Sequence, residues 1–345
     1  MAANENPHVL IAGIGGASLG TELGKALALA GGYRVTGCDI SSLAFGHYGG
    51  IFAKTFLVDQ HDYIDRVLDL CIRERVHVVL PGGEQPARLI AEAADRFAAE
   101  GIAVATNEAS TVTVLGDKQR CFAELMRLGF AVPKTVALTD ADADATAPIP
   151  CVVKPSVDSG GSSFVFFAGD RPAVRMYAAH LRHNGLRPLA QEYISHEGGE
   201  FTIGVLSGRQ RQTLGSIAMR REFPAKLSIA AKGADFLISS GISQGYIGPH
   251  PEVRKVAEAI ADAVGSTGPL NVQGRVDKIG NFLPFEINPR FSATTYLRAL
   301  AGFNEADYYI RHILGLTQRQ PLTTKPGWYL RSLTETVVAP EGLVT

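Results

Sequence analysis

The stretch FEINPRF, which begins at Phe285, carries more information on the fold than any other part of the chain. Its apolar residues, Phe285 and Ile287, alternate with Glu286, Asn288 and Arg290. Successive side chains of a β-strand point to opposite faces, so a strand would place these polar groups on one face. Because antiparallel sheets commonly expose one face to water, a solvated strand is the alternative interpretation of the stretch taken alone.

A second strand-like run, LNVQGRV from Leu270, precedes this stretch and is joined to it through the turn sequence KIGN. A two-residue or a four-residue loop in this turn gives the same antiparallel register. That register places Gln273 opposite Glu286 and Asn271 opposite Asn288, with Cβ atoms about 5 Å apart. The hairpin therefore gathers oxygen donors with a single carboxylate on one patch, and such donors suit Mg²⁺ rather than zinc.

Composition indicates an ordinary globular protein. The chain has 345 residues, of which 46% are hydrophobic and 19% charged, enough for two or three domains and a large core. The formal net charge of -1 gives no indication of a nucleic-acid or membrane partner. No apolar run approaches the roughly 20 residues that span a bilayer, and no signal peptide is evident at the N-terminus.

The cysteines are the second indication of compartment. They lie far apart, without C-x-x-C pairing or histidines at zinc-like spacing, at positions Cys38, Cys71, Cys121 and Cys151. Such cysteines are typical of buried thiols in a reducing cytosol. We therefore expect a cytoplasmic protein.

The first hundred residues alternate short apolar strands with amphipathic helices, a pattern that predicts a parallel, doubly wound α/β unit. Its first turn contains several glycines, among them Gly13 and Gly20, and Asp39 follows the second strand at a spacing seen in dinucleotide-binding sites. Glycines at this position also serve close packing where no nucleotide binds. Glu84 follows a later strand, where it could contact a ligand or stabilise a helix N-terminus.

The middle of the chain begins with a predicted helix that carries Phe122, Leu125 and Met126 on one face and ends at Gly129. An Ala/Asp/Pro-rich segment at 140–150 then predicts a loop or a linker between two units. A strand that carries Lys154 follows, with a loop of small residues from 158 to 163 and a second strand. Consecutive small residues let several backbone N–H groups converge on an anion, although a plain hairpin loop has the same composition.

In their order along the chain, these segments resemble the ATP-grasp fold. The series comprises Lys118, VVKP with Lys154, the DSGGSS loop, QEYI, Glu200 in EFTIGV, NVQ and FEINPR. The NVQ and EINPR parts are most similar to the ATP-grasp halves of the carbamoyl-phosphate synthase large subunit. The resemblance implies an α/β ATP-grasp fold with an N-terminal doubly wound domain at 1–106. A small lid subdomain would occupy 107–194 and a large subdomain 195–345.

The resemblance also implies roles for individual residues. Lys118 and Lys154 would contact the phosphates of ATP, and a loop would close over them, formed by Ser159, Gly160, Gly161, Ser162 and Ser163. A hinge of Gln191, Glu192, Tyr193 and Ile194 would hold adenine, and Glu200 would bind the ribose hydroxyls. Gln273, Glu286 and Asn288 would coordinate Mg²⁺, and Arg290 would act in catalysis with Lys154. Gln273 departs from the acidic residue of many relatives, which weakens the case for a second metal unless Asp277 compensates.

The expected function is an ATP- and Mg²⁺-dependent ligase that activates a small carboxylate as an acylphosphate for attack by an amine. Phosphoryl transfer between two anions needs cations rather than an acid–base pair, which agrees with the two lysines and the arginine. One alternative is phosphorylation of bicarbonate or carbamate, and another is a nicotinamide-dependent oxidoreductase that uses the N-terminal glycine turn. Arg220 and Arg221 could bind phosphate or lie on an exposed strand face. A homodimer would be unsurprising for an enzyme of this size.

Overall fold

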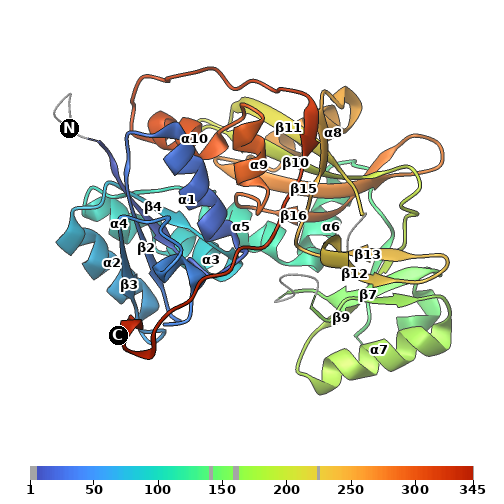
Figure 1. The fold of residues 1–345 in the computed structure, drawn as a ribbon. Coiled ribbons are helices and arrows are strands. Elements are labelled where there is room, and N and C mark those ends of the chain that lie inside the picture. The colour runs from blue at the N-terminus through green and yellow to red at the C-terminus, as the bar shows by residue number, and fades with distance from the viewer. Residues whose placement is uncertain (1–5, 140–142, 158–162, 224–225, 345) are drawn as a thin grey trace.

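The computed structural model describes residues 6–139, 143–157, 163–223 and 226–344. The chain forms an N-terminal unit, a lid unit and a large sheet with its helices (Figure 1). The sheet of the N-terminal unit is parallel, in the order β3-β2-β1-β4-β5, as the alternating pattern predicted. Its strands are β1 (His8–Ala12), β2 (Arg34–Asp39), β3 (Lys54–Leu57), β4 (Val78–Pro81) and β5 (Ala103–Val104). Its helices are α1 (Leu19–Ala30), α2 (Tyr63–Glu74), α3 (Glu84–Glu92) and α4 (Ala94–Ala99).

Glycines in the first turn of this unit permit very close backbone contact. A Cβ atom on Gly20 or on Gly82 would lie 1.8 Å from the carbonyl oxygen of Gly13. Asp39 is also occupied locally, since its Oδ2 accepts from the N–H of Ile14 at 2.7 Å and its Oδ1 from the N–H of Ser41 at 3.0 Å. The glycines therefore serve packing, and this geometry gives no support to a dinucleotide site.

The helix that was expected to end at Gly129 is α6 (Lys118–Arg127), and α5 (Ala109–Gly116) precedes it. Asp117 separates them because it adopts an extended conformation and its side chain caps α6, accepting from two backbone N–H groups. Phe122 is buried as predicted, but Met126 is 53% exposed and its assignment to the apolar face was wrong. The buried stripe of α6 consists instead of Cys121, Phe122 and Leu125.

The lid unit is a four-stranded antiparallel sheet covered by α7 (Arg171–His183). Its order is β6-β9-β7-β8, with β6 (Thr135–Ala137), β7 (Cys151–Pro155), β8 (Phe166–Ala168) and β9 (Pro188–Glu192). β6 and β7 both pair with β9, so the segment between them is a loop within one sheet and not a linker between units. The domain boundaries at 106 and 194 stay predictions.

The large sheet has the order β16-β15-β10-β11-β14-β17. Its strands are β10 (Glu200–Ser207), β11 (Thr213–Arg221), β14 (Gly245–Gly248), β15 (Pro269–Val276), β16 (Phe282–Asn288) and β17 (Gly327–Tyr329). One apolar cluster joins it to α5, α6 and α8 (Pro251–Ala263), and others join it to α1, α9 (Thr295–Leu300) and α10 (Glu305–Ile313). A small hairpin, β12 (Ile229–Lys232) with β13 (Leu237–Ser239), lies between this sheet and the lid (Figure 1).

The β15–β16 hairpin confirms the predicted pairing at its polar end. Gln273 lies opposite Glu286 and Asn271 lies opposite Asn288. The turn differs from both expected loops, because Val276 pairs with Phe282. A bulge at the Gln273/Gly274 step absorbs the one-residue difference, so the register is correct where the polar residues lie.

The C-terminal segment returns from β17 to the N-terminal unit (Figure 1). Arg331 forms an ion pair with Glu22 of α1 at 2.6 Å, and the N–H of Val344 donates to the hydroxyl of Tyr48. The C-terminal segment is therefore held against the N-terminal unit. Across the residues that the structure describes, no helix has the length and apolar character needed to cross a membrane.

The close contact at Gly13 predicts a large effect of a single methyl group. Gly20→Ala should lower the free energy of unfolding by about 2 kcal/mol or more, because its Cβ would overlap a backbone oxygen that cannot move alone. Denaturant unfolding of the purified variant measures this change.

Gly116→Ala is the matched control, since a Cβ there meets no atom within 4 Å. Gly116 ends a helix, and alanine there should leave stability unchanged or raise it slightly. Equal stability of the Gly20 and Gly116 variants would contradict the packing interpretation.

Candidate functional site

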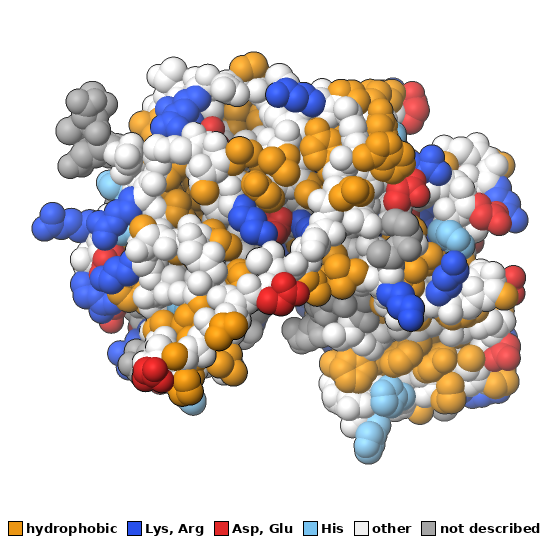
Figure 2. All heavy atoms as spheres, viewed as in Figure 1, with side chains coloured by type: hydrophobic (Ala, Val, Ile, Leu, Met, Phe, Trp, Pro, Cys, Tyr) orange, Lys and Arg blue, Asp and Glu red, His pale blue; other side chains and the backbone are white. Residues whose placement is uncertain are grey.

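A pocket lies where the lid, the large sheet and the N-terminal unit meet, and it collects most of the predicted site residues. Figure 2 shows the surface hollowed between the N-terminal and lid units. The predicted residues that line the pocket are Lys118, Lys154, Gln191, Glu192, Tyr193, Ile194, Gln273, Glu286 and Arg290. Segments separated by more than a hundred residues thus face one space.

Some predicted residues do not line the pocket. Glu200 and Asn288 are both buried and absent from the lining. Ser163 is exposed and also absent from it. The rest of the small-residue loop, residues 159–162, lies outside the described residues.

Lys154 is a buried cation that lines the pocket. Its Nζ donates to Oε1 of Gln191 at 2.8 Å and to the carbonyl oxygen of Phe285 at 3.0 Å. Within the described part of the chain no carboxylate forms an ion pair with it. Burial, and then repulsion from Lys118, lowers the pKa of Lys154 from 10.5 to about 7. An anion bound here would supply the missing negative charge.

The β-bulge explains why Lys154 finds a carbonyl oxygen in the middle of a strand. Phe285 is the extra residue of the bulge, and Phe285 and Glu286 both line the pocket although they are neighbours in the chain. Glu286 accepts from Nε2 of Gln273 at 2.8 Å and lies 3.9 Å from Nζ of Lys118. The bulge therefore brings the pocket lysines and the carboxylate to the same wall.

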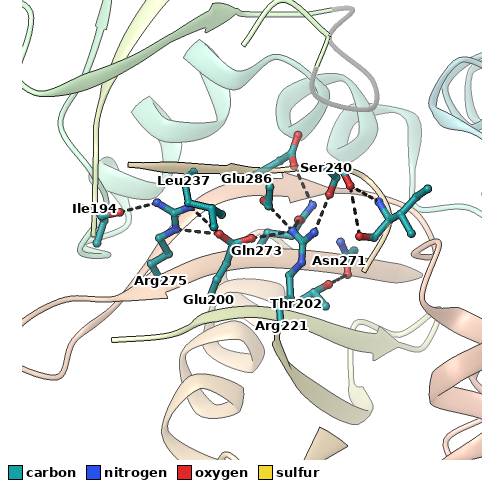
Figure 3. A network of polar contacts seen from close by, with 12 residues as sticks. Ile194, Glu200, Thr202, Arg221, Leu237, Ser240, Asn271, Gln273, Arg275 and Glu286 are labelled. Atoms are coloured by element: carbon teal, nitrogen blue, oxygen red, sulfur yellow. Dashed lines mark hydrogen bonds and ion pairs between the residues drawn. The ribbon is translucent and has the colours of Figure 1, made fainter. Parts of the chain in front are cut away.

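Glu200 forms a buried ion triad with two arginines (Figure 3). It lies directly opposite Arg221 on β11 and Arg275 on β15. Nη1 of Arg221 donates to its Oε1 at 2.7 Å, and Nε of Arg275 donates to its Oε2 at 2.9 Å. Burial alone would raise the pKa of Glu200, but the two guanidinium groups outweigh it and hold the pKa below its ordinary range. The carboxylate belongs to the wall behind the pocket.

Arg275 fastens the hinge to the large sheet, and sequence reasoning missed this role. Its Nη1 donates to the carbonyl oxygen of Ile194 and its Nη2 to that of Leu237, both at 2.7 Å. Its guanidinium lies 5.1 Å from the ring centroid of Tyr193. The signal was present in the sequence, because Arg275 alternates with Gln273 and therefore shares its strand face.

Arg221 is neither on an exposed face nor in the pocket lining, whereas Arg220 is exposed. Besides Glu200, Arg221 donates to Oγ of Ser239 at 2.9 Å and to the carbonyl oxygen of Ser240 at 2.7 Å. These serines line the pocket, and nothing in their local sequence indicated it. Only the folding of the β12–β13 hairpin against the large sheet brings them there.

Arg290 and Glu84 join the large sheet to the N-terminal unit across the pocket, at 2.7 Å. Glu84 is the first residue of α3 and follows β4, the place where open parallel sheets bind ligands. Burial alone would raise the pKa of Glu84, but the positive charges of Arg290 and Lys118 outweigh this effect and hold the pKa below its ordinary value. This carboxylate is thus a pocket residue as well as a helix N-terminal acid.

The donor chemistry of the hairpin fits a hard cation in part. Glu286 supplies anionic oxygens in the pocket, and Gln273 and Asn288 supply neutral ones on the same sheet face. In this structure Oε1 of Gln273 faces Arg221 at 3.4 Å. Asp277 does not add a ligand, since its carboxylate accepts from the N–H groups of Ile279 and Asn281 in the turn. Among the described residues there is no group of three or more His, Cys, Asp or Glu suited to a metal.

Comparison with known proteins agrees with this architecture. The family described as "ATP-grasp in the biosynthetic pathway with Ter operon" matches residues 189–336. The formate-dependent phosphoribosylglycinamide formyltransferase of Corynebacterium jeikeium (strain K411) is 27% identical over 321 residues, which cover 88% of this chain and 73% of that protein.

Solved structures show the same fold at lower identity. The biotin carboxylase domain of Hydrogenobacter thermophilus 2-oxoglutarate carboxylase, solved with MgADP, ADP and bicarbonate, has a TM-score of 0.65 at 19% identity and covers 91% of this chain and 70% of its own. The L-amino acid ligase of Bacillus licheniformis has a TM-score of 0.66 at 18% identity and covers 90% and 75%. This chain therefore has the ATP-grasp fold, and its residues 189–336 match an ATP-grasp family.

Proposed function

We propose that this protein is an ATP- and Mg²⁺-dependent ligase that activates a carboxylate as an acylphosphate for attack by an amine. The observation that carries the proposal is the convergence of Lys118, Lys154, Arg290 and Glu286 on one pocket beside the hinge. Three cations with one carboxylate suit the transfer of a phosphoryl group between two anions. The products are an amide, ADP and phosphate.

In this proposal ATP lies between the lid and the large sheet. Adenine contacts the hinge residues 191–194, and the phosphates extend toward Lys118 and Lys154 beneath the loop 159–163. Lys154 supports this placement because it is a buried cation held by neutral partners only. Glu200 gives the ribose contact less support, since both of its oxygens already accept from arginines.

Glu286 would hold Mg²⁺, with Gln273 and Asn288 as further oxygen donors. Bound Mg²⁺ neutralises charge on phosphoryl oxygens. Arg290 also lines the pocket, where Glu84 holds it and where it can receive the carboxylate substrate. That substrate attacks the γ-phosphorus as the bond to ADP breaks. The amine then attacks the acyl carbon, phosphate leaves, and the amine loses a proton.

The alternatives differ in how well they agree with these observations. Phosphorylation of bicarbonate or carbamate would use the same pocket. It is the second candidate, because a solved structure of the same fold contains bicarbonate. The resemblance to the ATP-grasp halves of the carbamoyl-phosphate synthase large subunit agrees with this second candidate and stays a prediction. The nicotinamide oxidoreductase has no support, because Asp39 already accepts from the backbone N–H groups of Ile14 and Ser41 and the similar proteins have the ATP-grasp fold.

Location and assembly remain part of the proposal. The four cysteines are free and buried, which agrees with a cytoplasmic protein. We also propose that the protein forms a homodimer and that its partners are small molecules, a carboxylate and an amine.

Release of ADP and phosphate tests the function directly. Purified protein with Mg-ATP is screened against carboxylic acids and amines, with bicarbonate included. Release that requires both an acid and an amine supports the ligase. Release with bicarbonate alone favours the second candidate, and the absence of ATP binding would refute both.

Glu286→Gln should lower ADP release at least about 100-fold, because it removes the only carboxylate among the proposed metal ligands. ATP affinity and the unfolding midpoint should stay close to those of the wild type, since glutamine keeps the size and can still bond Gln273. Steady-state ADP release and calorimetry measure these quantities.

Glu252→Gln on α8 is the control for this variant, because it makes the same charge change on an exposed first turn outside the pocket lining. It should release ADP as the wild type does. A Glu286 variant with full turnover would refute the metal assignment.

Proton uptake on ATP binding follows from Lys154. Its pKa near 7 leaves it mostly neutral at pH 8, and bound phosphates raise that pKa again. Binding of Mg-ATP should then take up roughly 0.9 proton at pH 8 and roughly 0.1 at pH 6. Calorimetry in buffers of different ionisation enthalpy measures the proton count.

Lys154→Met keeps the length of the side chain and removes the titrating group. It should weaken ATP binding and abolish the extra uptake at pH 8, while protons bound by ATP itself are counted equally in both proteins. The same count in wild type and variant at pH 8 would rule out Lys154 as a phosphate contact.

A further inference from the structure

Asn271 lines the pocket, and two neighbouring side chains hold its amide oxygen. Oδ1 accepts from Nη2 of Arg298 at 2.6 Å and from Oγ1 of Thr202 at 2.8 Å. Nδ2 makes no hydrogen bond to the described residues, and Figure 3 shows it on the side away from Thr202. The amide therefore presents a donor to the pocket.

The direction of this amide follows from chemistry. A guanidinium has only donors, so the atom of Asn271 that lies 2.6 Å from Arg298 must be its oxygen. Turning the amide over would place two donors against each other in a buried site. Arg298 thus fixes which end of the amide faces the pocket.

Arg298 is itself held rigidly. Its side chain is 1% exposed and forms an ion pair with Glu305 at 3.1 Å, and Glu305 also accepts from Oγ1 of Thr295 at 2.7 Å. Gly204 lies opposite Asn271 on the neighbouring strand, and a Cβ there would lie 2.3 Å from Nη1 of Arg298. The sheet thus leaves space at residue 204 for the guanidinium.

We propose that Arg298 is a positioning residue that fixes Asn271 so that its amide nitrogen donates a hydrogen bond to an oxygen of the phosphoryl group in transfer. This inference rests on the proposed function. A buried ion pair costs desolvation that apolar residues of similar volume would avoid. The Arg298–Glu305 ion pair would therefore serve to orient the amide of Asn271 in the pocket, and not only to stabilise the fold.

Asn271 and Asn288 have different roles in this proposal, although the sequence gives no reason to distinguish them. Asn271 and Asn288 lie directly opposite each other in the hairpin, and both could be taken as oxygen ligands of a metal. The contact with Arg298 assigns Asn271 a donor role toward an anion. Aspartate should therefore be tolerated at 288, where it keeps an oxygen ligand, and should be harmful at 271.

Calorimetry with ADP and fluoroaluminate tests the inference without knowledge of the substrates. In the presence of Mg²⁺, this complex mimics a phosphoryl group in transfer, so the wild type should bind it more tightly than ADP alone. Asn271→Asp should keep the affinity for ADP within about threefold. The increase in affinity that fluoroaluminate adds, called the gain below, should be about 100-fold smaller than in the wild type. The fold should survive, because an aspartate oxygen still accepts from Arg298.

Arg298→Lys tests the positioning role, since lysine keeps the charge beside Glu305 but not the planar pair of donors. It should lose at least about tenfold of the gain while ADP affinity is retained. Thr295→Val is the control, because it removes a buried hydrogen bond of Glu305 without touching Asn271, and it should keep the gain.

Each opposite result identifies what has failed. An Asn271→Asp variant that keeps the full gain, or that needs less Mg²⁺, would refute the donor role. An Arg298→Lys variant that keeps it would refute the positioning role. Loss of the gain in Thr295→Val alongside Arg298→Lys would reduce Arg298 to a structural role. A wild type without any gain would overturn the proposed phosphoryl transfer and this inference together.

Discussion

The pocket depends on one buried interaction, the contact of Glu200 with Arg221 and Arg275 across the three central strands of the large sheet. Charges removed from water are costly unless each is paired and its hydrogen bonds are made. Here the partners are directly opposite one another, and Arg275 also donates to carbonyl oxygens of the hinge and of the β12–β13 hairpin. Nε of Arg221 is buried without a hydrogen-bond partner among the described residues. One carboxylate thereby connects the sheet, the hinge and the small hairpin.

The triad also carries a net positive charge, and further cations line the pocket. These are Lys118, Lys154 and Arg290, and the carboxylates of Glu84, Glu192 and Glu286 line it as well. Lys154 is the extreme case, because the fold keeps an ammonium buried with neutral oxygen partners and lowers its pKa to about 7. An unliganded protein bears this cost, and a bound polyanion offsets it. Strong binding of phosphates is the expected outcome of such a design.

The sequence predicted the local features of the fold well. The alternation of β-strands and helices to residue 106 indicated the parallel sheet, and the polar pairs of the β15–β16 hairpin lie opposite each other as expected. Errors occurred where a single residue changes the local path of the chain. The buried stripe of α6 leaves Met126 exposed, and the bulge at Phe285 compensates for a turn whose pairing differs by one residue from the expected one. Neither feature changes the hydrophobic period, so pattern alone could not reveal it.

By itself the sequence determined the hairpin and its polar face, because paired strands that are neighbours in the chain are set by alternation and a short turn. It also supplied the ordered motifs of the ATP-grasp fold. The tertiary structure decided which charges meet. Glu200 has arginine partners because β10 lies between β11 and β15, and Asn271 faces Arg298 because residue 204 is a glycine. These contacts join residues up to 75 positions apart, so they depend on the order of strands in the sheet and not on any local pattern.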